Sequence, residues 1–182
     1  MAYALEIFFD AQADAAIRRL WDQLERAGVP TLLTASHQRH HPHVTLAVGE
    51  ERPKVGDDLV SALKPLPGRT LDFPVLGLFP GAAAVLFLGA KVTAPLLAAH
   101  ANVHAAIEGA NELGVTGDAD KMGALYKPGA WVPHCTLAMR LDAEGIVRAL
   151  RELHPYAGFG ATIAAVGLVD IATGDVEHLV GS

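Results

Sequence analysis

A hexapeptide occurs twice in this chain, and its recurrence constrains the fold more than any other feature. Residues 42–47 read Pro-His-Val-Thr-Leu-Ala and residues 133–138 read Pro-His-Cys-Thr-Leu-Ala, so only the third position differs. Successive side chains of a β-strand point to opposite faces of the sheet. As strands, the two copies are predicted to present His43, Thr45 and Ala47 against a buried Val44, Leu46 and Val48, and His134, Thr136 and Ala138 against a buried Cys135, Leu137, Met139 and Leu141.

Each copy thus offers one imidazole and one hydroxyl on an apolar backing. A single His-x-Thr is a weak signal, because most such matches are strand residues without a chemical role. Two copies of nearly the same hexapeptide carry more weight, and each begins with proline, which is tolerated at the first residue of a strand. Two such strands facing one cleft predict a two-histidine acid–base site.

The order of the predicted elements also repeats. Each half of the chain runs strand, helix, long loop, motif strand, helix, strand. His43 precedes Gly77 by 34 residues, and His134 precedes Gly167 by 33. Such self-similarity indicates an internal duplication.

The predicted fold class is α+β, in a single domain over residues 1–182. Two interleaved lobes, with repeat units of about 1–81 and 82–182, each contribute an antiparallel-rich sheet with flanking helices, related by a pseudo-two-fold around a central cleft. In addition to the second motif strand, strands are expected at 3–9, 43–49, 70–79, 83–92, 159–171 and 176–180. Helices are expected after Asp10, near 56–65, at 94–110 and from Asp142 through 153.

Composition limits the class of protein. A formal net charge of −6 argues against a protein that coats long nucleic acid, because such binding depends on many Lys and Arg contacts to phosphates. No run of about 18 uninterrupted apolar residues or export signal is present, so we expect no membrane span. The single cysteine, Cys135, excludes an intramolecular disulfide and is expected in the core. These features predict a cytoplasmic protein, and we expect a monomer.

The paired motifs, His43-Val44-Thr45-Leu46 and His134-Cys135-Thr136-Leu137, resemble those of the 2H phosphoesterase superfamily. The resemblance is to the bacterial RNA 2',3'-cyclic phosphodiesterases, also called 2'-5' RNA ligase-like proteins, and it covers nearly the whole chain. It implies hydrolysis of a 2',3'-cyclic phosphate or a 2'-5' phosphodiester in an RNA terminus or a small nucleotide. It also implies that no metal or other cofactor takes part, and that a cyclic substrate leaves a product with a 2'-phosphate.

The residues agree with that chemistry. A histidine can serve as base or acid near neutral pH, so His43 and His134 are the predicted proton-transfer groups, although the sequence leaves open which is which. Thr45 and Thr136 are predicted to donate hydrogen bonds to the non-bridging phosphate oxygens. The chain lacks a Gly-rich phosphate loop with its lysine, so an ATP-dependent ligase is not expected.

Further candidates precede the second motif. Tyr126 and Trp131 are predicted to stack on a base or cover the site, and Lys127 to face a phosphate; the alternative is that Trp131 packs between the lobes and Lys127 is only solvated. Arg39 and Arg140 are weaker phosphate-binding candidates, Arg140 because it continues the His134 face.

Two other functions remain open from the sequence. One is a non-catalytic module that binds RNA or a nucleotide in the same cleft. The other is a metal-dependent hydrolase that uses the histidines of residues 37–43, although Pro42 interrupts that cluster and the second motif has no counterpart. The spacing of His100, His104, His154 and His178 indicates only surface or helix-face positions.

Overall fold

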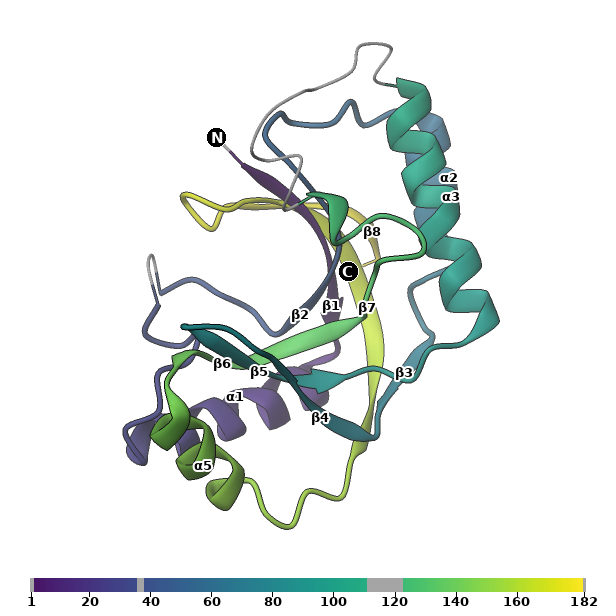
Figure 1. The fold of residues 1–182 in the computed structure, drawn as a ribbon. Coiled ribbons are helices and arrows are strands. Elements are labelled where there is room, and N and C mark those ends of the chain that lie inside the picture. The colour runs from purple at the N-terminus through teal and green to yellow at the C-terminus, as the bar shows by residue number, and fades with distance from the viewer. Residues whose placement is uncertain (1, 36–37, 111–122, 182) are drawn as a thin grey trace.

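The computed structural model describes residues 2–35, 38–110 and 123–181 (Figure 1). Its strands form two antiparallel sheets, which confirms the predicted fold class. One sheet has the order β2-β1-β7, with β3 and β8 both paired to β7; the other has the order β4-β5-β6. The first sheet comprises β1 (Tyr3–Phe9), β2 (His43–Gly49), β3 (Thr70–Phe73), β7 (Phe159–Asp170) and β8 (Val176–Gly181), and the second comprises β4 (Val75–Phe79), β5 (Ala84–Gly89) and β6 (His134–Leu141).

In the described part of the chain, helices flank the sheets in two pairs: α1 (Ala11–Arg26) contacts α5 (Ala143–Glu152), and α2 (Asp57–Leu63) contacts α3 (Ala94–Ala110). Figure 1 shows these pairs at opposite ends of the molecule. The predicted caps are present: the Asp10 carboxylate accepts from the Ala13 amide, and the Asp142 carboxylate accepts from the Gly145 amide, each at 2.8 Å.

Strand exchange between the halves of the chain places the motif strands. The last strand of the first half, β4, pairs with β5, whereas β7 of the second half pairs with β1. Both motif strands, β2 and β6, end up at the edge of the β2-β1-β7 and β4-β5-β6 paths, and they contact each other. Residues from the two halves of the chain are therefore brought to one junction between the sheets.

The strand predicted over 70–79 is wrong as a single element. It breaks at Pro74, so that β3 pairs with β7 and β4 pairs with β5 in the other sheet. Proline has no N–H to donate to a ladder, which explains why the chain changes sheets at this residue.

The predicted alternation of the motif strands fails after the threonine, for the same reason in both. In β2, Thr45 pairs with Glu6 and Ala47 with Leu5, so Leu46 is an extra residue without a register partner. In β6, Leu137 is extra in the same way. Such a β-bulge reverses the faces that follow it. Ala47 and Ala138 therefore turn to the core, and Val48 and Met139 turn to the cleft that the histidines line.

Two glycines lie at corresponding register positions, each separated from a motif threonine by one strand. Gly77 of β4 pairs with Phe87, and a Cβ there would overlap the Phe87 ring. Gly167 of β7 pairs with Glu6, and a Cβ there would lie 3.0 Å from the Phe8 ring. The glycines leave room for aromatic rings to lie across the backbone.

Gly77→Ala is expected to lower the free energy of unfolding by about 1–3 kcal/mol, because the new methyl group must displace the Phe87 ring. Urea denaturation followed by circular dichroism measures the change. Gly109→Ala in α3 is the matched control: a Cβ there meets nothing within 4 Å, so its stability should be unchanged or higher. Equal stability of Gly77→Ala and the native protein would contradict the assigned packing.

Candidate active site

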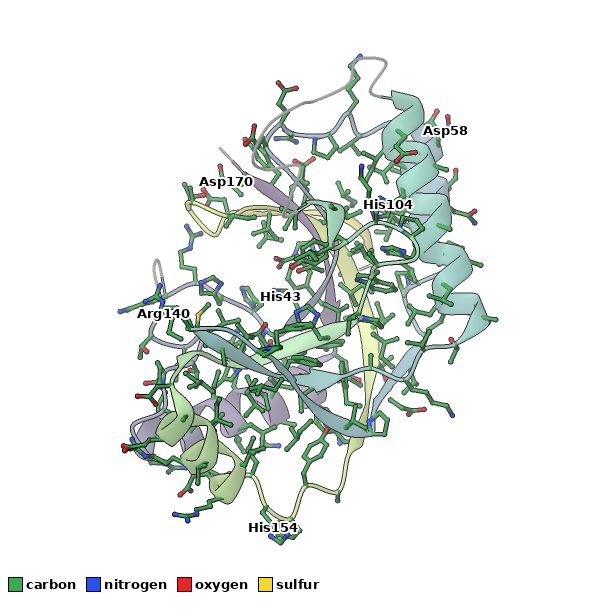
Figure 2. All side chains as sticks on the ribbon, in the orientation of Figure 1. His43, Asp58, His104, Arg140, His154 and Asp170 are labelled. Carbon is green, nitrogen blue, oxygen red and sulfur yellow. The ribbon has the colours of Figure 1, made fainter. Side chains whose placement is uncertain are left out.

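A cleft of about 690 Å³ contains the four residues predicted from the repeated motif, His43, Thr45, His134 and Thr136. Residues of both sheets line it, with His43 and Thr45 on β2 and His134 and Thr136 on β6. Figure 2 shows His43 near the middle of the molecule. The exchange of strands therefore brings the predicted residues together.

Both histidines are oriented by the same local hydrogen bond. His43 Nδ1 lies 2.7 Å from the carbonyl oxygen of His41, and His134 Nδ1 lies 2.7 Å from that of Val132. A carbonyl can only accept, so Nδ1 carries the hydrogen in each ring. Each Nε2 is then the nitrogen available for exchange of a proton with a ligand in the cleft.

The surroundings of the two imidazoles differ at one equivalent position. The residue that pairs across the strand with the motif threonine is Glu6 for Thr45 and Phe87 for Thr136. Glu6 Oε1 lies 3.5 Å from His43 Nε2, and both side chains are largely buried. The motif imidazole of β2 thus has a carboxylate as its neighbour.

His134 instead lies among aromatic rings. Its ring centroid is 4.9 Å from that of Phe79 and 5.1 Å from that of Phe87. Burial lowers the pKa of His134, and the charge of His43 lowers it further, against the opposing effect of the Val132 carbonyl. His134 is therefore the imidazole that the site favours in its neutral form.

The threonine of the first motif is tied to Tyr126. Thr45 is buried and lines the cleft, and its side chain hydrogen-bonds that of Tyr126. Burial and the nearby Glu6 carboxylate raise the pKa of Tyr126, so its phenol stays protonated. The hydroxyls of Thr45 and Tyr126 and the imidazole of His43 thus line the same cleft.

Behind the cleft, indole groups hold the motif backbone. Trp131 Nε1 donates to the Thr45 carbonyl at 2.9 Å, and Trp21 Nε1 donates to the Thr136 carbonyl at 3.0 Å. Each motif threonine is thus fixed through its own carbonyl by a tryptophan from a distant part of the chain.

A pair of buried histidines from α3 holds the bulge of β2. His100 Nε2 and His104 Nε2 each lie 3.1 Å from the carbonyl oxygen of Leu46, and the His100 ring stacks on Trp131 at 3.9 Å. Burial, with the His104 charge, lowers the pKa of His100 to about 4, so it is neutral at physiological pH. The two imidazoles thus satisfy the carbonyl that the bulge leaves without a strand partner.

A third contact fixes the segment that orients His43. Arg18 Nη2 donates to the His40 carbonyl at 3.2 Å and lies 3.1 Å from His41 Nδ1, while Arg18 Nε is paired with Asp14 at 2.6 Å. Arginine only donates, so His41 Nδ1 accepts. Burial and the Arg18 charge lower the pKa of His41, in agreement with a neutral ring.

Not all of the other candidate residues named from the sequence line the cleft. Tyr126 and Arg39 line the cleft, whereas Lys127 is exposed and outside its lining. Trp131 is buried behind β2 and is not part of the cleft lining, which agrees with the alternative that it packs between the lobes. Arg140 is exposed, has φ +58° and lies at the periphery in Figure 2, because a further irregularity in β6 ends the alternation.

The site residues predicted from the sequence did not include Glu6, Trp21, His100 and His104. The spacing of His100 and His104 indicates only surface or helix-face positions, and in the structure they are 1% and 8% exposed. Their four-residue spacing in an apolar helix was an available signal for one buried face. Glu6 was the one charged residue in the first predicted strand, and an isolated charge of that kind is also a usable signal.

The residues described by the structure contain no group of three or more His, Cys, Asp or Glu arranged to hold a metal ion. His37, part of the alternative metal cluster, lies outside those residues. Cys135 is buried as predicted, and burial raises the pKa of its thiol to about 12. Within the same described part of the chain, no helix is long and apolar enough to cross a bilayer.

The chain matches a family model described as the 2'-5' RNA ligase superfamily over residues 8–175. Among solved structures, TT0787 of Thermus thermophilus is similar with a TM-score of 0.58 at 20% identity, over 99% of this chain and 96% of that one. Usb1 of Kluyveromyces marxianus gives a TM-score of 0.50 at 11% identity, over 98% and 97% of the two chains. No curated protein matches the chain. At these identities the solved structures show a shared fold.

Trp131→Phe and Trp21→Phe are each expected to lower the free energy of unfolding by about 1–3 kcal/mol, because the ring is kept while a buried carbonyl loses its donor. Urea denaturation followed by circular dichroism tests both. Unchanged stability in both variants would show that the indole hydrogen bonds do not hold the motifs.

Proposed function

The chain belongs to the 2'-5' RNA ligase superfamily, and from that premise we propose that it is a 2H-type phosphodiesterase. It hydrolyses 2',3'-cyclic phosphates or 2'-5' phosphodiesters, in RNA ends or small nucleotides, without a metal ion. The observation that carries the proposal is the pair of imidazoles held by equivalent Nδ1 hydrogen bonds in one cleft, each beside a motif threonine.

The proposed reaction needs two proton transfers at phosphorus. One imidazole accepts a proton from water as the water oxygen bonds to phosphorus. The other donates a proton to the ribose oxygen as its bond to phosphorus breaks. Thr45 and Thr136 donate hydrogen bonds to the non-bridging oxygens, where negative charge must be stabilised. Tyr126 is hydrogen-bonded to the Thr45 side chain and holds its hydroxyl in place.

The unequal surroundings assign the two roles. His134 acts as the base, since burial against Phe79 and Phe87 favours its neutral form. His43 then acts as the acid, with the Glu6 carboxylate 3.5 Å from its Nε2. The sequence alone could not separate these roles, because the two motifs are nearly identical. Cytoplasmic location and a monomeric state stay predictions.

His43→Ala and His134→Ala are each expected to lower kcat for a 2',3'-cyclic mononucleotide by about 10²–10⁴-fold, because each removes one proton-transfer group. Turnover is measured by chromatography of the product in excess EDTA. His154→Ala is the matched control, since His154 lies outside the cleft lining and far from His43 in Figure 2.

Near-native turnover in His134→Ala would overturn the two-histidine mechanism. Activity of the native protein that disappears in EDTA and returns with a divalent ion would favour the metal-dependent alternative instead. Tight binding of the cyclic nucleotide without turnover would favour a binding module.

The pH profile tests the assignment of acid and base. The base must be neutral, and the pKa of His134 is lowered, so the acidic limb of kcat/KM is expected below about pH 6.5, the unperturbed value for histidine. Glu6→Gln leaves the aromatic rings around His134 in place, so the acidic limb should stay where it is in the native protein.

Glu177→Gln is the control for that variant, because Glu177 is an exposed carboxylate paired with Arg52 outside the cleft lining. Movement of the acidic limb in Glu6→Gln but not in Glu177→Gln would mean that His43 is the base. The same shift in both variants would indicate a general charge effect.

A further inference from the structure

The cleft carries little positive charge. Among the described residues that line it, the charged side chains other than histidine are Glu6 and Arg39. Arg39 is 2.8 Å from the Asp175 carboxylate and also donates to the Thr173 carbonyl, so much of its charge is already compensated. The hydroxyls and imidazoles at the junction of β2 and β6 provide donors for one phosphate group.

A nucleic-acid chain needs a different surface. Each additional phosphate in contact requires a Lys or Arg to replace its counterions, and the resulting affinity depends steeply on salt. Here the formal net charge is −6, and the cleft contains a carboxylate beside one of its two motif histidines. The electrostatics therefore favour a ligand with a single negative charge over a polyanion.

Apolar walls flank the phosphate-binding groups on both sides. Val48, Val169 and Val176 contribute from the larger sheet, and Phe79, Val85 and Met139 contribute from the smaller one. Two of these wall side chains depend on the bulges at Leu46 and Leu137. The bulges turn Val48 and Met139 to the cleft in place of the smaller Ala47 and Ala138. The walls therefore offer apolar surface to the organic part of a ligand.

The size of the cleft agrees with a small ligand. Its volume of about 690 Å³ lies in the range of pockets that enclose one small molecule. Such pockets are mostly apolar with a few convergent polar groups, which is the pattern described here.

We propose that the cleft binds a single mononucleotide unit, with one phosphate and a flat ring system packed between the apolar walls, and makes no contact with further nucleotides of an RNA chain. The inference rests on the proposed function for the position of the phosphate at His43 and His134. It narrows that function by assigning the class of substrate.

Binding is measured with the His134→Ala variant, in which turnover does not consume the ligand. Isothermal titration compares adenosine 2',3'-cyclic phosphate, glycerol 1,2-cyclic phosphate and a ten-nucleotide RNA ending in a 2',3'-cyclic phosphate, each at several salt concentrations. The mononucleotide is expected to bind about 30-fold or more tighter than the glycerol ester, because only the mononucleotide has a base that covers the apolar walls and removes their surface from water. The RNA is expected to bind within about threefold of the mononucleotide, with a log–log salt slope no steeper than about −1.

A matched pair of substitutions tests the apolar walls. Val48→Thr keeps the size of the side chain but adds a hydroxyl to the wall, and it should weaken the mononucleotide about threefold or more without changing binding of the glycerol ester. Val75→Thr, also on a strand but 53% exposed and outside the cleft lining, should change neither affinity.

Three results would overturn the inference: RNA binding about tenfold or more tighter than the mononucleotide with a salt slope beyond about −2, equal affinity for the mononucleotide and the glycerol ester, or no binding of the mononucleotide. Failure of the proposed function would look different. In that case the ligands would bind as expected to His134→Ala, and the native protein would still not hydrolyse the mononucleotide.

Discussion

One extra residue in each motif strand, Leu46 in β2 and Leu137 in β6, is the constraint on which the rest of the site depends. Without these bulges, strict alternation would place alanines in the cleft and larger side chains in the core. The carbonyl of Leu46, which has no register partner on β1, would also not be presented to the two buried histidines of α3. The bulges thus determine the cleft surface, and in β2 also the contacts that hold its backbone.

The site is symmetric in its backbone and asymmetric in its chemistry. Equivalent Nδ1 hydrogen bonds orient the two imidazoles, and an indole donates to the carbonyl of each motif threonine. The difference arises where Glu6 in β1 corresponds to Phe87 in β5. One side chain places a negative charge near His43, and the other contributes to the burial that lowers the pKa of His134. Two identical groups thus have unequal electrostatic surroundings because of a single pair of positions.

The chemistry of the cleft also limits what can occupy it. Hydroxyls and imidazoles provide for one phosphate, whereas the walls are built largely from aliphatic and aromatic side chains. Membership of the 2'-5' RNA ligase superfamily is compatible with more than one kind of phosphodiester, and the family relationship alone does not choose among them. The low positive charge and the apolar lining of the cleft favour a small phosphodiester, because a polyanion would have to be desolvated without compensating cations.

The sequence by itself determined the motif residues, the α+β class with two antiparallel sheets and the capped starts of α1 and α5, because these depend on local patterns and on a repeat visible along the chain. It did not determine the break at Pro74, the faces after Thr45 and Thr136, or the burial of His100, His104 and Trp131, because these depend on pairing with distant strands. Glu6 is likewise recognisable as an isolated charge in an apolar strand, but its proximity to His43 arises only when β1 pairs with β2. Tertiary structure alone decided which imidazole is biased toward the neutral form, since protonation depends on neighbours that lie far apart in sequence.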